Sequence, residues 1–307
     1  MPSVMENGCT YMTCMMKKLR RAAALILTCA VCLAGCGSAD SQESVEETSA
    51  EQQEELQEQY SSTSMVPVPS DMAYRYNTSA FVLNSVGDMT YTDSSYSYRD
   101  GIDVSSFNGD IDWNAVKNAG YTFVFIRIGY RGYESGAISA DERFEEYYDG
   151  AVAAGLDVGV YFYSQALDEK EASEEASFVI SRLAGRELQL PVVIDVEDPA
   201  DVNVRTAAMQ SDEYTTVVKK FMSDIEAEGY DTVLYTNLYG ETYMMNMYNL
   251  DGVKIWFSGF SETPNTEYTF DFWQYTNTGI VDGISGDVDL DIQMLPDGSD
   301  KASPMPE

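Results

Sequence analysis

The sequence predicts an α/β fold: an irregular, TIM-like (β/α) barrel over residues 100–295, with eight strands and fewer than eight helices. Three observations support this prediction. Eight segments rich in strand-forming residues follow one another, helical stretches separate the first five, and the segments between the last ones are too short for full helices. Regular alternation of strands and helices favours parallel strands, and eight strands in one domain favour a closed barrel.

Each element has a recognisable signature. The expected strands are rich in β-branched and aromatic residues and cover 101–106, 122–130, 157–164, 190–198, 231–237, 254–260, 271–276 and 287–292. Helices are expected over 112–119, 140–154, 168–184 and 207–228. A glycine follows each of them, as is typical of helix C-termini.

Residues 1–36 have the pattern of a lipoprotein signal peptide. Basic residues between 17 and 21 precede an apolar run from Ala22 to about Leu33, which is too short to span a bilayer as a stable helix. The run ends in Leu33-Ala34-Gly35-Cys36, which resembles the bacterial lipobox. The resemblance implies a lipid on Cys36 and an extracytoplasmic protein anchored to the bacterial cell membrane. The alternatives are an ordinary signal peptide or a short anchor.

Three further segments flank the predicted barrel. Residues 37–64 are rich in Ser, Glu and Gln and nearly free of large apolar side chains, which predicts a disordered acidic tether. Residues 65–99 are expected to form an extension that packs on the barrel, with a possible β-hairpin around Gly87-Asp88. Residues 296–307 form a polar tail.

Composition excludes several classes of function. The net charge of -33 argues against nucleic acid or an anionic membrane surface as an electrostatic partner, so the lipid anchor is the expected membrane contact. The chain has no His, and its five Cys all lie within residues 1–36. The predicted barrel therefore has no His- or Cys-based nucleophile system, and its acid-base chemistry depends on carboxylates, Tyr or Lys. A monomer without a cofactor is expected.

The predicted strands have one apolar face and one polar face. The apolar faces are expected to pack under the helices and contain Val124, Ile126, Ile128, Val158, Val160, Phe162, Val192, Ile194 and Val196. The opposite faces carry Asp103, Ser105, Arg127, Tyr161, Tyr163, Asp195, Glu197, Tyr235, Asn237, Asp289 and Asp291. These side chains lie near the C-terminal ends of the strands, where (β/α) barrels build their active sites, so they should converge on one cleft.

Paired carboxyls with aromatic rings indicate glycoside hydrolysis. Asp195 and Glu197 are two residues apart on one strand, which places their backbones roughly 6.6 Å apart on the same face. Mutual repulsion and burial would raise the pKa of one of them, leaving it able to act as an acid. The alternatives are a metal site of Asp/Glu type, although no metal is required, and ion pairing with Arg127.

The same stretches resemble, in order, the motifs of glycoside hydrolase family 25. They are "GIDVSSFNGDIDW" (101–113), "FIRIGYRGY" (125–133), "AGLDVGVYFYS" (154–164), "PVVIDVED" (191–198), "LYTN" (234–237), "FWQYT" (272–276) and "GISGDVDLD" (283–291). The resemblance implies a lysozyme that cuts the β-1,4 bond between N-acetylmuramic acid and N-acetylglucosamine in the glycan strands of peptidoglycan.

The resemblance also implies a role for each site residue. Glu197 would be the general acid. Asp195 would assist through the N-acetyl group of the substrate, or Asp103 or Asp289 would activate water for inversion. The aromatic positions that match the family are Tyr161, Tyr163, Tyr235 and Trp273, with core packing as the alternative for each.

Two stretches depart from the family pattern, which affects the expected contacts with the sugar subsites but not the general acid. The stretch "SSFNG" (105–109) lacks a His that many family members carry, and "WFSGF" (256–260) departs from the usual pattern.

Three other functions are alternatives: a transporter's substrate-binding lipoprotein, a non-catalytic wall-binding lipoprotein and a glycosidase acting on chitin-like glycans. The chitinase pattern has a further Asp at the position that Val193 occupies here.

Overall fold

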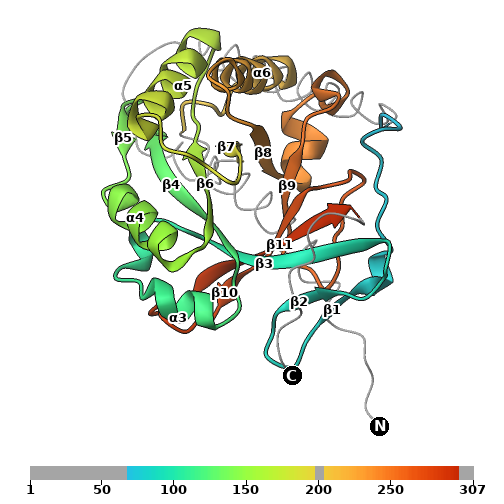
Figure 1. Cartoon of the computed structure of the whole chain (residues 1–307). Coiled ribbons are helices and arrows are strands. Elements are labelled where there is room, and N and C mark those ends of the chain that lie inside the picture. Colours follow the sequence, from blue (N-terminus) through green and yellow to red (C-terminus); the bar gives the residue numbers. More distant parts are fainter. Residues whose placement is uncertain (1–67, 198–203, 297–307) are drawn as a thin grey trace, which may run out of the picture. The chain divides into compact units, whose positions relative to one another are not determined.

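The computed structural model describes residues 68–197 and 204–296, and these form an eight-stranded barrel (Figure 1). The strands lie in the order β3-β11-β10-β9-β8-β7-β6-β4, and pairing of β3 with β4 closes the ring. Their bounds are β3 (Tyr96–Val104), β4 (Phe123–Arg131), β6 (Asp157–Tyr163), β7 (Val192–Asp195), β8 (Thr232–Asn237), β9 (Ile255–Ser258), β10 (Phe272–Gly279) and β11 (Val288–Pro296). The predicted fold class is confirmed.

One barrel strand runs against the predicted direction. β11 is antiparallel to both of its neighbours, β10 and β3, whereas the other neighbouring barrel strands are parallel. Parallel neighbours require a crossover of a dozen or more residues, and only residues 280–287 separate β10 from β11. The short connection that made the end of the barrel irregular therefore also reverses its last strand.

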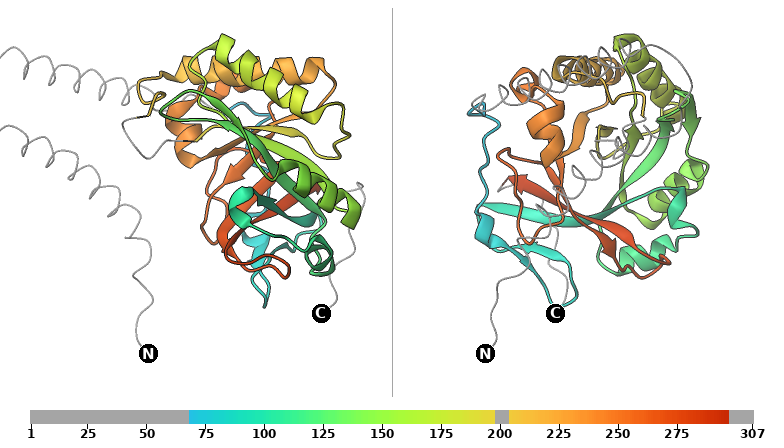
Figure 2. Two further views of the ribbon diagram at one scale, coloured as in Figure 1. Left: turned by 90° about the vertical axis from the view of Figure 1, so that its left-hand side faces the viewer. Right: turned by 180° about the vertical axis from the view of Figure 1, so that it is seen from behind.

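Four helices lie outside the ring of strands, and Figure 2 shows the closed ring from behind. They are α3 (Trp113–Asn118), α4 (Phe144–Ala154), α5 (Glu169–Leu183) and α6 (Ser211–Ala227). The side chain of Asp112 caps α3 and that of Asp168 caps α5 by accepting hydrogen bonds from backbone N–H groups. None of the helices in residues 68–197 and 204–296 is long and apolar enough to cross a bilayer.

The predicted helix over 140–154 begins later than expected. A short strand, β5 (Ile138–Ala140), pairs antiparallel with the end of β4, and the helix starts only at Phe144. Short helices of other types complete the connections. The 3₁₀ helix η2 (Ser106–Asn108) follows β3, and the π-helix η3 (Gly240–Met244) and the 3₁₀ helix η4 (Met247–Leu250) follow β8.

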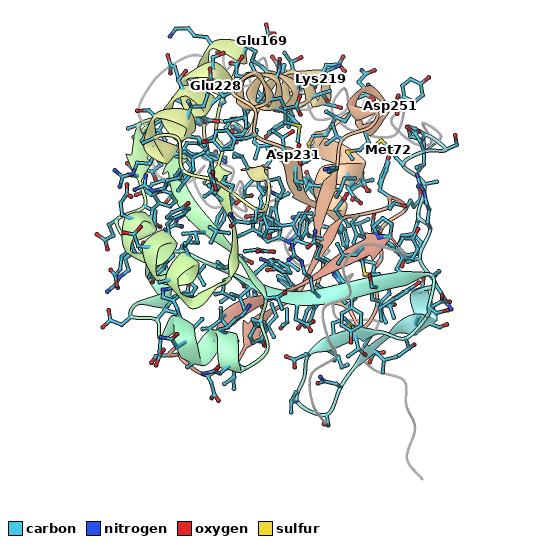
Figure 3. All side chains as sticks on the ribbon, in the orientation of Figure 1. Met72, Glu169, Lys219, Glu228, Asp231 and Asp251 are labelled. Carbon is cyan, nitrogen blue, oxygen red and sulfur yellow. The ribbon has the colours of Figure 1, made fainter. Side chains whose placement is uncertain are left out.

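The barrel wall separates two apolar layers. All nine predicted outward-facing residues of β4, β6 and the β7 region are buried in the core that also contains the helices. The inner layer is filled by Phe123, Phe125, Leu190, Val193, Val233, Tyr235, Trp256 and Phe272, with Tyr161 packed against them. Side chains fill the space inside the ring (Figure 3), so the barrel is a packed core and not a pore.

The segment before the barrel packs on its outer face. After η1 (Thr78–Ala80), the strands β1 (Phe81–Leu83) and β2 (Met89–Tyr91) pair antiparallel around a turn that contains Gly87 at φ 101°. The ring of Phe81 lies 5.3 Å from that of Trp273 on β10, edge to face. β3 begins at Tyr96, so the first barrel strand starts within the predicted extension.

Candidate active site

Three strands, β3, β7 and β11, bring the site carboxyls together inside the barrel. Asp103 on β3 pairs in register with Asp289 on β11, so both side chains lie on the inner face. Asp195 ends β7, where it pairs with Tyr163 on β6 and Tyr235 on β8. Asp103 and Asp195 are at the C-terminal ends of parallel strands, as the sequence predicted, whereas Asp289 is at the start of the antiparallel β11, whose direction brings it beside Asp103.

Asp195 has a carboxyl oxygen that receives no hydrogen bond from the described part of the chain. It is buried, and its Oδ1 atom has no hydrogen-bond partner within the described residues. Burial raises the pKa of Asp195 well above its usual range and the charge of Glu197 adds to the effect, while Arg127 lowers it. Glu197 follows β7 and is partly exposed. The pair therefore combines a buried acceptor with a carboxyl that reaches solvent.

Asp103 is held by a buried amide. Gln274 Nε2 donates to Asp103 Oδ2 at 2.7 Å. The amide orientation is fixed from the other side, because the hydroxyls of Tyr235 and Ser258 both donate to Gln274 Oε1, at 2.8 and 3.0 Å. Burial raises the pKa of Asp103 well above its usual range, and the nearby charges of Asp289 and Asp291 raise it further.

The two carboxyls of β11 differ in exposure. Asp289 is partly exposed, and burial raises its pKa to about 6. Asp291 is fully buried, and its Oδ1 atom accepts a hydrogen bond from Trp256 Nε1 at 2.8 Å. Asp289 is thus the β11 carboxyl that can face substrate, and Asp291 lies below it.

Arg127 pairs with a carboxylate outside the predicted set. Its guanidinium lies 2.8 Å from Asp141, which is buried, and donates to Ser106 Oγ at 3.2 Å. The ring of Phe107 lies over it, 4.9 Å from centroid to guanidinium carbon, and is 87% exposed. Arg127 therefore pairs with Asp141 and supports an exposed aromatic ring, while its charge also lowers the pKa of Asp195.

The three predicted tyrosines all lie at the site. Tyr161 and Tyr235 pack edge to face on Trp256, with ring centroids 6.3 and 4.7 Å apart. The hydroxyl of Tyr163 accepts a hydrogen bond from Gln165 at 3.2 Å. Tyr161 and Tyr163 are partly exposed, whereas Tyr235 is buried and contacts the carboxyl network through its hydroxyl.

Trp273 does not lie at the site. Its side chain is 0% exposed and belongs to the outer core, and its Nε1 donates to the backbone oxygen of Gly259 at 2.9 Å. Because neighbours along a strand face opposite sides, Gln274 takes the inner position on β10. The expected sugar contact through Trp273 is wrong, and the alternative of core packing describes it.

Sequence reasoning did not place four residues at the site: Phe107, Asp141, Trp256 and Gln274. Strand alternation was the signal that could have found two of them, because Trp256 and Gln274 share the inner face with predicted residues. Phe107 and Asp141 lie outside the predicted strands, so no alternation marked them.

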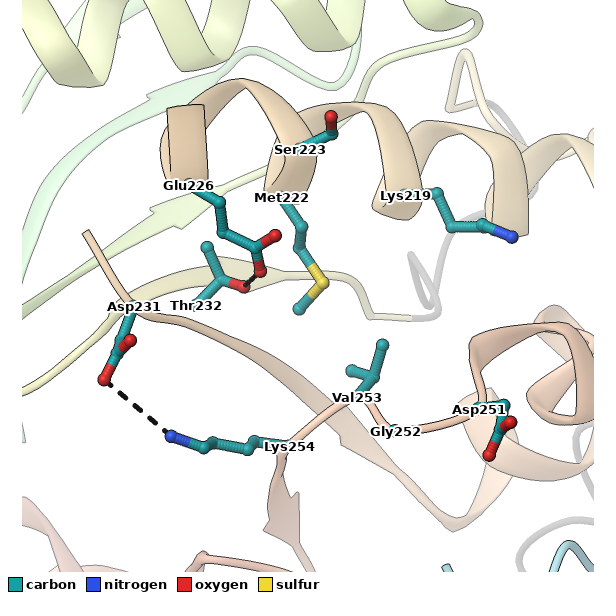
Figure 4. A pocket seen from close by; sticks show the side chains of 10 residues that line it. All are labelled: Lys219, Met222, Ser223, Glu226, Asp231, Thr232, Asp251, Gly252, Val253 and Lys254. Carbon is teal, nitrogen blue, oxygen red and sulfur yellow. Dashed lines mark hydrogen bonds and ion pairs between the residues drawn. The ribbon is translucent and has the colours of Figure 1, made fainter. Parts of the chain in front are cut away.

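Within residues 68–197 and 204–296, no group of three or more Asp, Glu, His or Cys side chains is arranged to hold a metal ion. A surface depression of about 330 Å³ lies between α6, the start of β8 and the segment before β9 (Figure 4). It is at the N-terminal ends of these strands, opposite the carboxyl cluster.

Comparison with known proteins agrees with this geometry. The sequence profile of glycosyl hydrolases family 25 matches residues 102–284, a range that contains Asp103, Asp195 and Glu197. The chain belongs to glycosyl hydrolase family 25. This confirms the family that the motifs indicated.

Relatives in family 25 cover similar parts of the chain. The autolytic lysozyme of Clostridium acetobutylicum is 32% identical over 193 residues, which are 62% of this chain and 54% of that protein. Lysozyme M1 of Streptomyces globisporus is 30% identical over 203 residues, covering 62% and 65%. The crystal structure of a bacterial lysozyme from Streptomyces coelicolor is 29% identical, with a TM-score of 0.54, and covers 66% of this chain and 93% of that one. The chain spans about half the length of the first relative.

Proposed function

We propose that this family 25 protein is a peptidoglycan hydrolase that cuts the β-1,4 bond between N-acetylmuramic acid and N-acetylglucosamine. The observation that carries the proposal is the pair of Asp195, buried with an unpartnered oxygen, and Glu197, which is partly exposed, at the C-terminal end of the barrel. Relatives that are at least 30% identical bear the name lysozyme.

Glu197 is the proposed general acid. It donates its proton to the glycosidic oxygen as the bond to the anomeric carbon breaks, so the leaving sugar departs as a neutral alcohol. The partly exposed position of Glu197 supports this role because the group must reach the scissile bond and later exchange its proton with water.

Asp195 is the proposed partner of the substrate's N-acetyl group. Its unpartnered Oδ1 is an acceptor that the amide N–H of the substrate can fill. The Asp195 carboxylate beside that amide favours attack of the acetamido oxygen on the anomeric carbon. This attack closes a five-membered ring, and the carboxylate stabilises the positive charge that develops on the acetamido nitrogen. Water then opens this intermediate with Glu197 as base, which retains the anomeric configuration.

Inversion is the alternative route. Asp289 is the best-placed base for it, because it is partly exposed and its pKa is raised to about 6. In that route Asp289 removes a proton from the attacking water while Glu197 protonates the leaving oxygen, and no covalent intermediate forms.

We also propose that the mature protein is tethered to the bacterial membrane through a lipid on Cys36, facing the wall outside the cytoplasm. Cys36 and the expected tether, residues 37–64, lie outside the described residues. The proposal is supported by the basic segment, the short apolar run and the lipobox-like sequence that ends in Cys36. Cys36→Ala should release the protein from the membrane fraction or leave it unprocessed, measured by fractionation and mass spectrometry. Normal processing with retention in the membrane would contradict the lipid anchor.

Analysis of the cleavage products tests the enzymatic proposal. Purified peptidoglycan is digested, the new reducing ends are reduced with borohydride, and the fragments are identified by mass spectrometry. Muramic acid ends support the proposal. Glucosamine ends, cleavage of chitin oligosaccharides alone, or binding without cleavage would each overturn it.

A further inference from the structure

Two buried carboxyls of the site lie on neighbouring strands, Asp103 on β3 and Asp291 on β11. Asp103 is 4% exposed and Asp291 is 0% exposed. Asp291 pairs in register with Gly101, two residues before Asp103 on β3, so it lies one step further from the C-terminal end of the barrel. Gly101 has no side chain to separate the groups, and a Cβ atom there would meet the ring of Phe123 at 2.2 Å.

The N–H and hydroxyl donors that the described residues place around Asp103 and Asp291 are too few to stabilise two ionised carboxylates. Asp103 receives one from Gln274, and Asp291 receives one from Trp256 at its Oδ1. No other N–H or hydroxyl of the described residues reaches Asp291 Oδ2. The remaining polar group beside Asp291 is the carboxyl of Asp103, diagonally across the β3–β11 pair and likewise buried. Two carboxyl groups can form a hydrogen bond with each other only if one of them carries a proton.

Nearby cations do not neutralise the pair. The titratable and charged side chains that face it from the surrounding strands are Arg99, Arg127, Tyr161, Asp195, Tyr235 and Asp289, with Glu197 beyond Asp195. Arg99 is ion-paired with Asp157 and Arg127 with Asp141. The remaining groups are acids or phenols, so two buried negative charges would be uncompensated, which is strongly unfavourable.

We infer that Asp103 and Asp291 share a single proton at neutral pH and form a hydrogen-bonded acid pair with one negative charge. The direction of the pKa values agrees: burial and the charge of Asp289 raise both of them well above the usual range. Titration of such a pair belongs to the pair and not to either residue alone.

The shared proton defines the part that Asp291 plays in the reaction, and this step rests on the proposed function. Asp291 is a positioning residue: it keeps Asp103 within a hydrogen-bonded pair instead of leaving it as a free carboxylate base. Inversion through Asp103 is then disfavoured, because its proton-accepting oxygen is already engaged. The acetamido route through Asp195 and the inverting route through Asp289 are unaffected.

Counting protons on the folded chain tests the inference without substrate. Unfolded aspartates have pKa values of about 3.9, so at pH 7.5 the unfolded chain holds no proton on this pair. The pH dependence of the free energy of unfolding near pH 7.5 gives the protons bound on folding. Full-length wild type should bind about one proton more than the Asp103→Asn/Asp291→Asn double variant. A difference of about zero or about two protons would overturn the inference.

A matched variant and a second measurement keep this test sharp. Asp149→Asn, at an exposed position on α4, is the control variant for this count. If the double variant does not fold, infrared spectroscopy of the wild type and Asp291→Asn replaces it. The carbonyl band of a protonated carboxyl should be present in the wild type at pH 7.5 and lost or shifted in Asp291→Asn. An identical band in both proteins, or no band in the wild type, would contradict the shared proton.

The pH profile of turnover then separates positioning from simple structural support. Asp291→Asn removes a neighbouring negative charge and should move the pH optimum for peptidoglycan cleavage by about one unit. A purely structural role would lower activity by the same factor at every pH. If wild-type protein cuts no peptidoglycan, the proposed function fails, but the proton count still decides whether the pair shares a proton.

Discussion

The inner and outer faces of the barrel wall come from the same strands, yet their side chains have different roles. Outward-facing side chains pack in the core, and inward-facing polar ones build the site. Trp273 and Gln274 are neighbours on β10. Trp273 faces outward and packs on Phe81 of the preceding segment, while Gln274 faces inward and orients Asp103. The difference shows that strand alternation lets one strand serve stability on one face and chemistry on the other, so substitutions at neighbouring positions should have separable effects.

The largest expected effect is on the inner face. Glu197→Gln keeps the shape of the side chain but cannot donate a proton to the leaving oxygen, so turnover should fall by about 10²–10⁴-fold. The midpoint of thermal unfolding should stay unchanged. Release of reducing ends from peptidoglycan measures turnover, and circular dichroism measures folding. The matched control is Glu228→Gln, an exposed residue at the end of α6, which should behave as wild type. Near wild-type turnover in Glu197→Gln would transfer the role of acid to Asp103 or Asp289.

The next effect is on the outer face. Trp273→Ala leaves a cavity in the outer core and should lower the free energy of unfolding by about 3–5 kcal/mol. At a temperature where the variant remains folded, its turnover should change little. Denaturant titration gives the stability, and reducing-end release gives the turnover. A folded variant that loses turnover more than stability would mean that Trp273 serves the site after all.

Its neighbour should show the reverse pattern. Gln274→Leu removes the donor to Asp103 and the acceptor of Tyr235 and Ser258, so the orientation of Asp103 is lost. Stability should fall by about 1–3 kcal/mol because buried polar groups lose partners. Turnover of the folded variant should fall by about tenfold or more, since orientation of catalytic groups contributes strongly to rate. Gln274→Glu is the matched variant, because it retains the acceptor oxygens but places another negative charge beside Asp103. If Gln274→Leu kept full turnover, the amide would be only structural.

The smallest expected effect concerns a carboxyl on the outer face. Asp100 is two residues before the outward-facing Ile102 of β3, and burial, followed by the charge of Asp88, raises its pKa to about 7. The unfolded value is about 3.9, so between these pH values the folded chain binds a proton that the unfolded chain releases. The contribution of Asp100 to the free energy of unfolding is therefore highest at low pH, and it is lost as the pH rises through about 7.

Replacing this carboxyl should flatten the pH dependence. Between pH 5 and 8, Asp100→Asn should lose about 1–2 kcal/mol less stability than the wild type, measured by denaturant titration. Asp149→Asn, at an exposed position on α4, serves as the control. Parallel curves for wild type and Asp100→Asn would show that Asp100 is ionised in the folded protein at neutral pH.

Sequence predicted the features that follow from alternation within long segments. All eight strands, the outer apolar layer and the positions of Asp103, Asp195 and Asp289 depend on residue types that repeat every second position. Two predictions were wrong: the parallel direction of the last strand, and the start of a helix at residue 140. β11 runs antiparallel because its connection is short, and residues 138–140 form a strand because β4 offers a free edge.

The supporting residues of the site could not be read in the same way. Asp141 and Phe107 act through Arg127, and nothing in their own segments marks them. Trp273 misled the prediction because an aromatic residue in a matching motif was assigned by type. Its position next to Gln274 decides which side of the wall it faces.

The pairing of the first and last barrel strands determines when the site can exist. Residues Asp289–Pro296 of β11 pair with Tyr96–Asp103 of β3, and these strands supply Asp103, Asp289 and Asp291. Nearly the whole domain separates the two strands in the chain, so a growing polypeptide holds one of these three carboxyls, Asp103, until its last strand has been made. Contacts of such long sequence separation form late in folding. Assembly of the site is thus coupled to completion of the chain, and a truncated product that lacks β11 would carry the acid Glu197 without Asp289 and Asp291.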